Sequence, residues 1–414
     1  MRVRETFIVG VGMTPFGRFP ETRVGALAAR AAAETLADAG ARSEQAEAIV
    51  FANATQGALD GQHGIRGQAA LDGSGFGNAP VINVENACAS ASTALNLAHV
   101  LVASEAHDCV LAIGAEKMVM ADPAKSMAAF EGSWDLTRRQ QTIDELLAMG
   151  RNAMPPPGSE TNEPHSVFMD VYAAFCRHHM ATFGTTQRQM AAVSAKNHGH
   201  SVHNPRSQYR RSFSVDEVLA ARSVVWPLTV PMCSPVSDGA AAALVCSRAF
   251  AERLGALSHA VRIRASVLMS GDHRDPDRLN DHVARKASLR AYAVAGLGPD
   301  EIDVVECHDA TAFGEILQSE MLGFFNFGDG GPAAERGETR LGGSIPFNPS
   351  GGLESKGHPI GATGLGQIFE LVSQLRGQCA PRQIEGARTA LAENGGGLRG
   401  VEEAAVAITI LERA

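Results

Sequence analysis

The segment AAAETLADAGARSEQAEAIVFA (residues 31–52) has a counterpart of the same pattern, KASLRAYAVAGLGPDEIDVVEC (residues 286–307). Each copy predicts a helix, an Ala-Gly pair that ends the helix, a short linker with acidic residues, and a strand rich in β-branched residues. Such self-similarity is typical of a duplicated structural unit. The alternation of helix and strand predicts an α/β fold to which each half of the chain contributes one such unit.

The sequence around the first copy continues the same alternation. Residues 7–11 and 109–114 are short apolar runs of the kind that form buried strands. Residues 23–40 and 90–104 place Ala and Leu at helical spacing. Aromatic residues make up only 5% of the chain, and small residues are abundant. We therefore expect helices that pack closely against a sheet.

Between residues 121 and 220 the composition changes. This stretch contains the prolines of MPPPGSETNEP (residues 154–164) and the polar run KNHGHSVHNPRSQYR (residues 196–210). Irregular segments over a regular scaffold are common places for ligand binding. The predicted division is an N-terminal half of residues 1–120 and 221–255, an inserted loop domain of residues 121–220, and a C-terminal half of residues 256–414.

The composition also argues against several kinds of protein. The net charge is −9, so the chain lacks the general basic footprint of a nucleic-acid-binding protein. Seven widely spaced cysteines without a CxxC pair argue against a disulfide framework or a structural zinc site. Because we find neither a signal-peptide pattern nor an apolar run long enough to span a membrane, we expect a cytoplasmic protein.

Three histidines, His198, His200 and His203, form an HxHxxH array. Their spacing is compatible with metal binding, but no carboxylate or cysteine lies close in the sequence. We therefore expect them to form a solvated helix end, and we expect the protein to hold no metal.

Cys88 is the first candidate catalytic residue. It lies in NVENACASASTALNLA (residues 83–98), where a strand-like segment is followed by an amphipathic helix. At the start of a helix, the helix dipole and the free backbone N–H groups favour the thiolate, which is the nucleophilic form. Ala87 and Ala89 leave room for a substrate. The alternative is a small buried core residue, the common fate of a free cysteine.

His358 is the second candidate. It lies in SGGLESKGHPIGATGLGQIFEL (residues 350–371), whose glycines predict a tight turn before a helix that begins near Ala362. A histidine held in such a turn could take the proton of a cysteine thiol and so activate the sulfur. The alternative is a loop histidine that caps the following helix.

These two motifs, together with SPVSDGAAAALV (residues 234–245), resemble the thiolase superfamily, and the resemblance covers nearly the whole chain. The runs KNHGHSVHNPRSQYR and ECHDATAFGE (residues 306–315) are closer to the sterol-carrier-protein-type thiolases than to the acetoacetyl type. The resemblance implies a duplicated five-layer αβαβα thiolase fold with an inserted loop domain that helps to bind coenzyme A. It also implies dimerisation through the sheet region of the first half.

The same resemblance assigns further site residues. His308 stands where common thiolases have an Asn-Glu-Ala-Phe motif, and its N–H could donate to a thioester oxygen that becomes an enolate; the alternative is a structural histidine at a strand end. Neither second cysteine of the family is present, because the corresponding positions hold Glu393 and Ala310. Glu393, or less favourably Cys307, would then move the proton, unless a different base does. The backbone N–H of Gly396 would complete a second oxyanion hole with that of Cys88.

Ligands and partners also follow from the resemblance. Arg206, Arg210 and Ser234 are assigned to coenzyme A, although an exposed basic face is an equally good explanation of the arginines. Coenzyme A is expected as a co-substrate, with no permanently bound cofactor. We expect a homodimer, and relatives of this branch often associate with a small OB-fold/zinc-ribbon protein.

The leading hypothesis is an acyltransferase that cleaves a 3-oxoacyl-CoA with coenzyme A in a β-oxidation-type pathway of lipid metabolism. One alternative is a retro-aldol lyase that acts on a 3-hydroxyacyl-CoA, because the second cysteine is missing. Another is a degenerate scaffold subunit that serves the OB-fold/zinc-ribbon partner. The sequence leaves open the acyl chain and the direction of the reaction.

Overall fold

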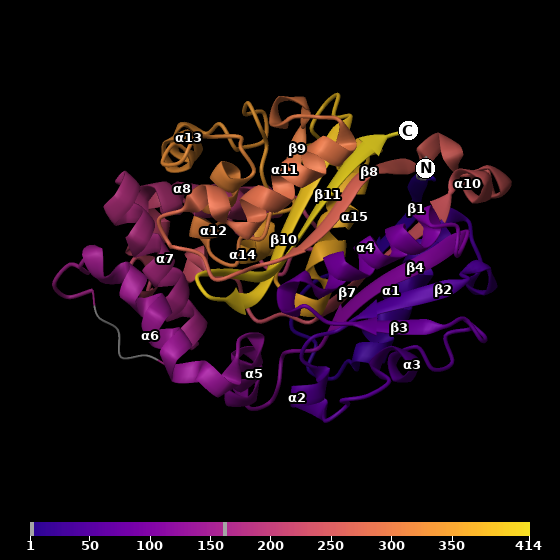
Figure 1. Ribbon diagram of the computed structural model, residues 1–414, viewed down its shortest axis with the longest axis horizontal. Coiled ribbons are helices and arrows are strands. Elements are labelled where there is room, and N and C mark those ends of the chain that lie inside the picture. The colour runs from indigo at the N-terminus through magenta and orange to yellow at the C-terminus, as the bar shows by residue number, and fades with distance from the viewer. Residues whose placement is uncertain (1–3, 160–163) are drawn as a thin grey trace.

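The computed structural model describes residues 4–159 and 164–414, and one sheet runs through it (Figure 1). Its strands follow the order β3-β2-β4-β7-β1-β8-β11-β10-β9. One part of the sheet consists of β1 (Thr6–Met13), β2 (Ala48–Ala52), β3 (Val81–Val84), β4 (Cys109–Glu116) and β7 (Gly239–Ser247). The other part consists of β8 (Val261–Ser270), β9 (Val304–Glu306), β10 (Thr389–Arg399) and β11 (Glu402–Arg413).

The two parts of the sheet meet at a narrow seam between β1 and β8. The paired residues there are Phe7 with Arg262 and Ile8 with Val261. By contrast, β8 pairs with β11 along most of its length. The seam therefore connects two sheets that are otherwise separate.

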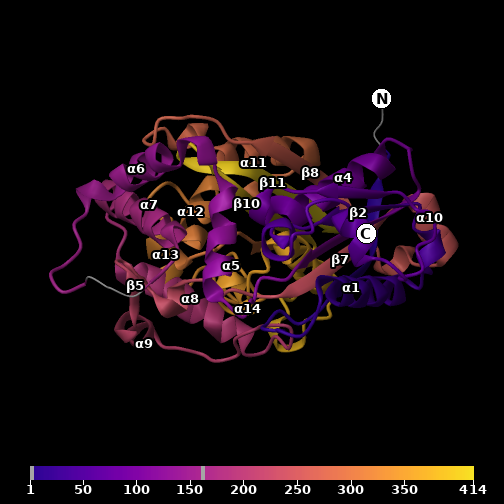
Figure 2. The ribbon, with the colours of Figure 1, turned by 90° about the horizontal axis from the view of Figure 1, so that it is seen from below.

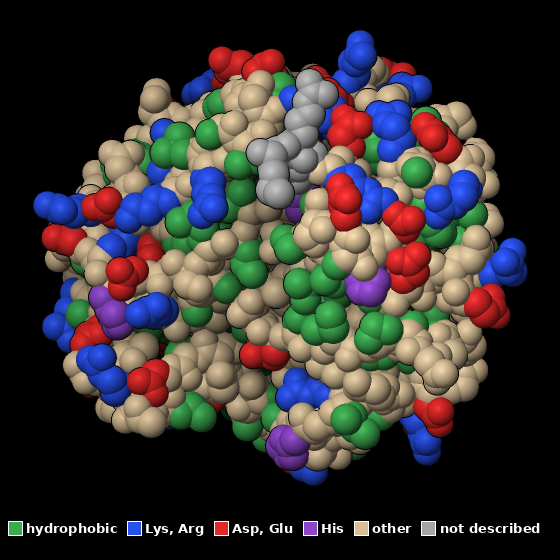
Figure 3. Space-filling view, turned by 45° about the vertical axis from the view of Figure 1, so that its right-hand side comes forward, with side chains coloured by type: hydrophobic (Ala, Val, Ile, Leu, Met, Phe, Trp, Pro, Cys, Tyr) green, Lys and Arg blue, Asp and Glu red, His purple; other side chains and the backbone are tan. Residues whose placement is uncertain are grey.

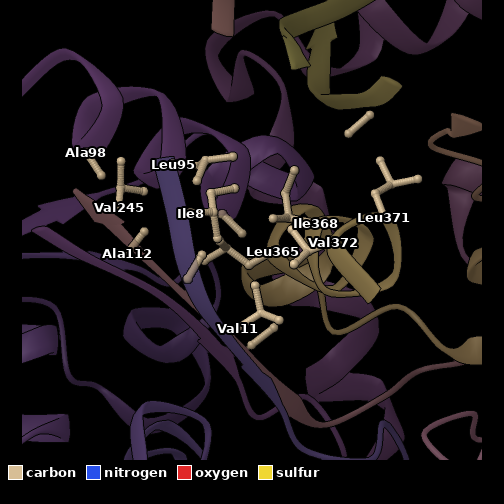
Figure 4. Close-up of a cluster of buried hydrophobic side chains, with 14 of the residues drawn as sticks. Ile8, Val11, Leu95, Ala98, Ala112, Val245, Leu365, Ile368, Leu371 and Val372 are labelled. Atoms are coloured by element: carbon tan, nitrogen blue, oxygen red, sulfur yellow. The ribbon is translucent and has the colours of Figure 1, made fainter. Parts of the chain in front are cut away.

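Helices cover both faces of each part of the sheet. The outer helices are α1 (Val24–Ala39) on one part and α11 (Val283–Ala295) with α12 (Ala312–Met321) on the other. Between the two parts lie α4 (Ser90–Ala103) and α15 (Thr363–Leu375). Figure 4 shows how Leu95 of α4 and Leu365 of α15 pack beside Ile8 of β1. The predicted five-layer αβαβα arrangement is thus confirmed.

The repeated sequence unit appears in the structure as two equivalent elements. In the first copy α1 leads to β2, and in the second α11 leads to β9. Both helices end at a glycine in the left-handed conformation, Gly40 with φ 65° and Gly296 with φ 66°. A residue without a Cβ adopts this conformation freely, which explains why the Ala-Gly pair recurs.

Small residues allow the close packing that the composition predicted. A Cβ added at Gly10 of β1 would lie 2.7 Å from the Cβ of Ala39, and one at Gly12 would lie 2.5 Å from the backbone N of Thr35. Helix α1 therefore approaches β1 more closely than any side chain at those positions would permit. The alanine run of β7, which is fully buried, serves the same layer.

Helices α5 to α9 lie beside the sheet rather than on its faces, as Figure 2 shows, and Figure 1 shows the same for α5 to α8. Their bounds are Pro123–Phe130, Arg139–Met149, Val167–Phe183, Gln187–Ser201 and Val215–Ala220. Part of the proline-rich segment, residues 160–163, lies outside the described residues. The domain boundaries at residues 120, 220 and 255 stay predictions.

The remaining elements are short. The helices are α2 (Gln56–Asp60), α3 (Arg66–Ala70), α10 (Arg248–Leu254), α13 (Gly330–Arg336) and α14 (Gly352–Lys356). The small sheet consists of β5 (Ser223–Val225) and β6 (Leu228–Thr229).

The prediction that the HxHxxH array forms a solvated helix end is wrong for its first two members. His198 and His200 are buried, and only His203 is exposed. His200 Nε2 accepts the backbone N–H of Leu341 at 3.2 Å, and its Nδ1 lies 3.0 Å from the carbonyl oxygen of Asn348. The sequence pattern did not show this burial, because histidine is polar and the hydrogen-bond partners of these two residues come from a distant part of the chain.

Charged side chains of both signs are interspersed over the face in Figure 3, without a large basic patch on that face. Within the two described stretches of the chain, no helix combines the length and the apolar character needed to cross a bilayer.

Candidate active site

A cavity of about 380 Å³ lies where the helices beside the sheet meet the C-terminal part of the chain. Cys88, His308 and His358 all line it. Much of the remaining wall is aromatic, with contributions from Phe130, Phe168, Tyr172, Phe175, Phe183 and Phe313. A concave, mainly apolar site with a few polar groups at one end is the usual form of a small-molecule binding pocket.

Cys88 sits in a strained turn between β3 and α4. The turn is a single 3₁₀ turn, Ala87–Ala89, and Ala87 has φ 48°, a left-handed conformation that is uncommon for a residue with a side chain. Ser90 holds the turn closed: its Oγ accepts the backbone N–H of Asn86 at 2.9 Å and donates to the carbonyl of Ala87 at 2.6 Å. The predicted position of Cys88 between a strand and a helix start is confirmed.

The expectation that this position favours the thiolate is not supported in the unliganded protein. Burial, with a smaller contribution from the nearby Glu116 carboxylate, raises the pKa of the Cys88 thiol to about 12, although hydrogen bonding to the backbone partly opposes the shift. Desolvation outweighs the helix N-terminus here, although Cys88 is only partly buried and lines the cavity. The Cys88 thiol is therefore neutral at rest.

We expect alkylation of Cys88 by iodoacetamide to rise about tenfold per pH unit between pH 7 and 9.5 without levelling off, because the thiolate fraction grows that way below the pKa. Peptide mapping of the labelled protein would follow Cys88 separately from the other cysteines. An ordinary thiol levels off above about pH 8.5. Levelling off anywhere below pH 9.5 would contradict the raised pKa.

His358 is fixed by its neighbours in an orientation suited to a base. Its Nδ1 lies 2.6 Å from Oγ1 of Thr363, and that hydroxyl donates to the carbonyl of Pro359 at 3.1 Å. Nδ1 must therefore carry the proton and donate to Thr363, which leaves Nε2 free to accept a proton. Burial and the neighbouring His308 and Lys356 lower the pKa of His358 well below its usual value, so the ring is neutral.

His308 follows β9 and is oriented from behind by Glu393. The backbone N–H of His308 donates to Oε2 of Glu393 at 2.9 Å. Burial lowers the pKa of the His308 ring to about 4. Its Nε2 is buried and has no hydrogen-bond partner among the described residues. A neutral ring with an unused nitrogen in a cavity wall can donate to an oxygen of a bound substrate.

The structure brings these three side chains together from distant parts of the sequence. The Cys88 sulfur and one ring nitrogen each of His308 and His358 lie within 4.8 Å of one another. The two imidazole rings are 5.2 Å apart between centroids. Such donors could also hold a soft divalent metal ion, and they are the one group so placed in residues 4–159 and 164–414. The absence of a catalytic metal stays a prediction.

The glycine loop of β10 approaches the Cys88 turn closely. A Cβ added at Gly396 would lie 2.5 Å from the backbone N of Ala89 and would also clash with the carbonyl of Asn86. Only a glycine allows this approach. Gly396 lines the cavity, as its predicted part in an oxyanion hole requires.

The residues assigned to coenzyme A are placed differently from one another. Ser234 lines the cavity. Arg206 does not: its guanidinium contacts the carbonyl of Met13 and pairs with Glu34 at 2.9 Å, so the geometry does not support a contact with coenzyme A. Arg210 is exposed and donates to the carbonyl of Val202, next to Tyr209 at the cavity wall.

Tyr172 of α7 and Glu403 of β11 are among the cavity residues that the sequence interpretation missed. Tyr172 lies in the predicted inserted domain, in a stretch with several aromatic residues, and Glu403 follows another glutamate in a strand without a recognisable motif. Neither signal distinguishes a site residue from an ordinary one.

A buried acidic network lies behind the histidines. It contains Glu306, which pairs with Lys356 at 2.9 Å, and Glu354, which accepts from Asn197 at 2.8 Å. Burial, together with the nearby Glu315, raises the pKa of Glu354 to about 8 despite the hydrogen bond from Asn197. The folded state therefore favours the protonated form of Glu354.

We expect the substitution Glu354→Gln to stabilise the fold at pH 8, by about 1–3 kcal/mol. Between about pH 4.5 and 8 the folded state binds this proton and the unfolded state does not, so wild-type stability falls as pH rises through that range. Urea unfolding at pH 5 and pH 8 would show a shallower decline in the variant. Glu252→Gln, on the exposed side of α10, serves as the control.

Comparison with known proteins agrees with this geometry. A family model for the N-terminal domain of thiolases matches residues 6–219, and a thiolase C-terminal domain-like model matches residues 269–411. An acetyl-CoA acetyltransferase of Methanothermobacter thermautotrophicus is 37% identical over 405 residues, which cover 96% of this chain and 98% of that protein. Human sterol carrier protein 2 is 36% identical over 411 residues, covering 95% of this chain and 70% of that protein.

Among solved structures, the Ltp2-ChsH2(DUF35) aldolase has the same fold, with a TM-score of 0.76, 22% identity, and coverage of 98% of this chain and 97% of that chain. The chain belongs to the thiolase superfamily. Within that superfamily it is an enzyme of the thiolase-type acyltransferase class.

Proposed function

We propose that the enzyme cleaves a 3-oxoacyl-CoA with coenzyme A through an acyl group held on Cys88. The observation that carries the proposal is the convergence of the Cys88 sulfur with nitrogens of His308 and His358 within 4.8 Å on one cavity wall. A thiol beside a neutral imidazole is an arrangement for nucleophilic catalysis, and a second imidazole can stabilise an oxygen that gains negative charge.

In the first half-reaction, Nε2 of His358 takes the thiol proton as the Cys88 sulfur attacks the keto carbon. The bond between the keto carbon and its neighbour breaks, and the electron pair passes into the enolate of the shorter acyl-CoA. The enolate oxygen accepts a hydrogen bond from His308, whose Nε2 has no other partner among the described residues. Protonation of the enolate carbon releases the shorter acyl-CoA.

In the second half-reaction, the thiol of coenzyme A loses its proton and attacks the thioester on Cys88. The developing oxyanion lies near the backbone N–H groups of Cys88 and Gly396, which the close approach of the two turns brings together. The Cys88 sulfur leaves and recovers its proton from His358. Because thiol and imidazole are both neutral at rest, no charged pair has to be desolvated before substrate arrives.

Incubation of the wild-type protein with a series of acyl-CoA thioesters tests the proposal. We expect intact-mass spectrometry to show an increase equal to the acyl group, and peptide mapping to locate it on Cys88. Absence of any increase across acetyl-, hexanoyl- and phenylacetyl-CoA, or an acyl group on another residue, would count against an acyl-cysteine intermediate.

The cavity wall favours an apolar acyl group. Its aromatic side chains offer little to an acidic chain, and both arginines of the wall are engaged: Arg274 pairs with Glu402 at 2.9 Å, and Arg222 also has a partner. We expect hexanoyl- and phenylacetyl-CoA to acylate Cys88 at least about ten times faster than succinyl-CoA, because an unpaired buried carboxylate is costly. Acylation rates from intact-mass time courses would measure the ratio.

Two other candidate activities can be distinguished from acyl transfer with variants of the same protein. A retro-aldol lyase acting on a 3-hydroxyacyl-CoA needs the enolate site of His308 but not the sulfur, so its activity would survive in Cys88→Ala. A scaffold subunit would show neither activity unless an OB-fold/zinc-ribbon partner were added. The presence of the thiol at the cavity wall favours acyl transfer.

The broader setting is part of the proposal and rests on the sequence resemblance. It comprises a degradative role of the β-oxidation type in lipid metabolism, a cytoplasmic homodimer and coenzyme A as the co-substrate with no permanently bound cofactor. Light scattering after gel filtration, with and without a candidate partner, would test the state of assembly.

A further inference from the structure

The proposed reaction needs a group that protonates the enolate carbon, and the three residues already assigned are otherwise engaged. His358 holds the proton of Cys88, and His308 donates to the enolate oxygen. Two carboxyl groups line the cavity within the described part of the chain, those of Glu402 and Glu403. Glu402 is ion-paired with Arg274 and also accepts the backbone N–H of Val283 at 2.9 Å. Glu403 is the carboxyl group without such an ion pair.

Within the described residues, only one of the two carboxyl oxygens of Glu403 has a hydrogen-bond partner. Its Oε1 accepts from Nε2 of Gln318 at 3.1 Å. Its Oε2 is buried and has no hydrogen-bond partner among the described residues. Nε2 of His282 lies 3.5 Å from it and would form an ion pair only if that ring were protonated. Burial lowers the pKa of His282 to about 3, so that ring is neutral. An unsatisfied buried carboxyl oxygen in a cavity wall is costly and calls for a functional explanation.

The side chain of Glu403 packs against the glycine loop of β10, and both Glu403 and Cys88 line the cavity. A Cβ added at Gly395 would lie 2.7 Å from Cγ of Glu403, so the glutamate side chain folds across a position that has no side chain. The next residue, Gly396, faces the turn of Cys88. Tyr172 lies within electrostatic range of both groups, because burial together with Cys88 and Glu403 raises the pKa of its phenol.

Glu393, at the position of the family's second cysteine, is placed differently. Its side chain is fully buried and does not line the cavity, and one of its oxygens accepts the backbone N–H of His308. This contact makes Glu393 a positioning residue for His308. Cys233 does line the cavity, but its thiol donates to the carbonyl of Thr229 at 3.5 Å.

We propose that Glu403 is the acid and base that exchanges a proton with the carbon next to the thioester. In the first half-reaction its O–H bond breaks, the proton goes to the enolate carbon, and a carboxylate remains. In the second, that carboxylate takes the proton of the coenzyme A thiol as the sulfur attacks the acyl group, which restores the acid. The inference rests on the proposed function, because it assigns the proton step of that reaction.

The electrostatic setting favours the acid form of Glu403 at rest. Burial raises the pKa of Glu403, and a hydrogen bond to its own backbone, the charge of Arg274 and the hydrogen bond from Gln318 oppose this shift. The raised pKa favours the protonated form that the first half-reaction needs.

Exchange of the methyl protons of acetyl-CoA with D₂O, followed by NMR, isolates this step. The measurement is made in a Cys88→Ser background, where no thioester forms on the enzyme, so it does not depend on the acyl-cysteine intermediate. We expect Glu403→Gln to slow exchange at least about 100-fold and Glu403→Asp to retain about a tenth of the rate. Exchange with Glu403 intact should rise with pH through the raised pKa, and this rise should vanish in Glu403→Gln.

Matched variants separate the alternatives. Cys233→Ser, which changes another cavity group, should stay within about twofold of its parent, and thermal unfolding would check that each variant is folded. Absence of exchange with Glu403 intact, unchanged exchange in Glu403→Gln, or a larger loss in Glu393→Gln or Tyr172→Phe than in Glu403→Gln would overturn the proposal. Loss of acylation at Cys88 with normal Glu403-dependent exchange would instead contradict only the acyl-cysteine mechanism.

Discussion

Replacing Cys88 with serine is expected to lower kcat for cleavage of a 3-oxoacyl-CoA by about 10⁴-fold or more, roughly 5.5 kcal/mol of transition-state stabilisation. A hydroxyl is far harder to deprotonate than a thiol, and the buried, neutral His358 is a weak base for that purpose. The site already raises the pKa of the Cys88 thiol to about 12, so we expect it to deprotonate a less acidic hydroxyl even less readily. Steady-state thiolysis of a 3-oxoacyl-CoA, followed by mass spectrometry of the products, measures the loss.

Cys233→Ser is the matched control, since its thiol also lines the cavity. Its turnover should remain within a few-fold of wild type. The Cys88→Ser protein should still bind acyl-CoA, because the aromatic wall of the cavity is unchanged. Turnover above about 1% of wild type in Cys88→Ser would argue for a reaction that does not pass through sulfur.

Replacing His358 with asparagine is expected to lower kcat/KM by about 10³-fold. The amide keeps a polar group in the turn but cannot take the proton of Cys88. Because the ring is neutral at rest, the loss should be similar from pH 6.5 to 8.5. Stopped-flow measurement of the acylation step, with thermal unfolding as a check of the fold, would report it.

Thr363→Val tests how much of that effect depends on orientation. The variant removes the oxygen that accepts Nδ1–H of His358 and leaves the ring in place. A loss of about tenfold, much smaller than that of His358→Asn, is expected for a positioning residue. If Thr363→Val lost as much as His358→Asn, the role of His358 would be structural rather than that of a base.

The layered fold could be predicted because each step depends on local pattern. The unit around Ala39-Gly40 and its repeat at Ala295-Gly296 carry the helix end, the linker and the strand in the sequence itself. The turns that hold Cys88 and His358 are likewise predicted by the glycines and other small residues around them. Their meeting across the two halves followed from the duplication.

What the sequence could not predict depends on surroundings. The helix start at Cys88 suggested a thiolate, but the pKa of the thiol is set mainly by desolvation, which is known only once the cavity is built. His198 and His200 are buried because distant backbone groups bond them. Likewise, the contact of Glu393 with the backbone of His308 and the unpaired, buried oxygen of Glu403 appear only in three dimensions.

The placement of the two middle helices has one further consequence. Cys88 lies two residues before α4, His358 lies five residues before α15, and the short 3₁₀ turns at the two helix starts touch each other. The distance between Cys88 and His358 is therefore set by how α4 and α15 pack against one another in the buried core, not by surface loops. Substitutions that repack this core should therefore change turnover even when they lie far from any substrate atom. Small shifts of the outer helices should leave the reacting atoms aligned.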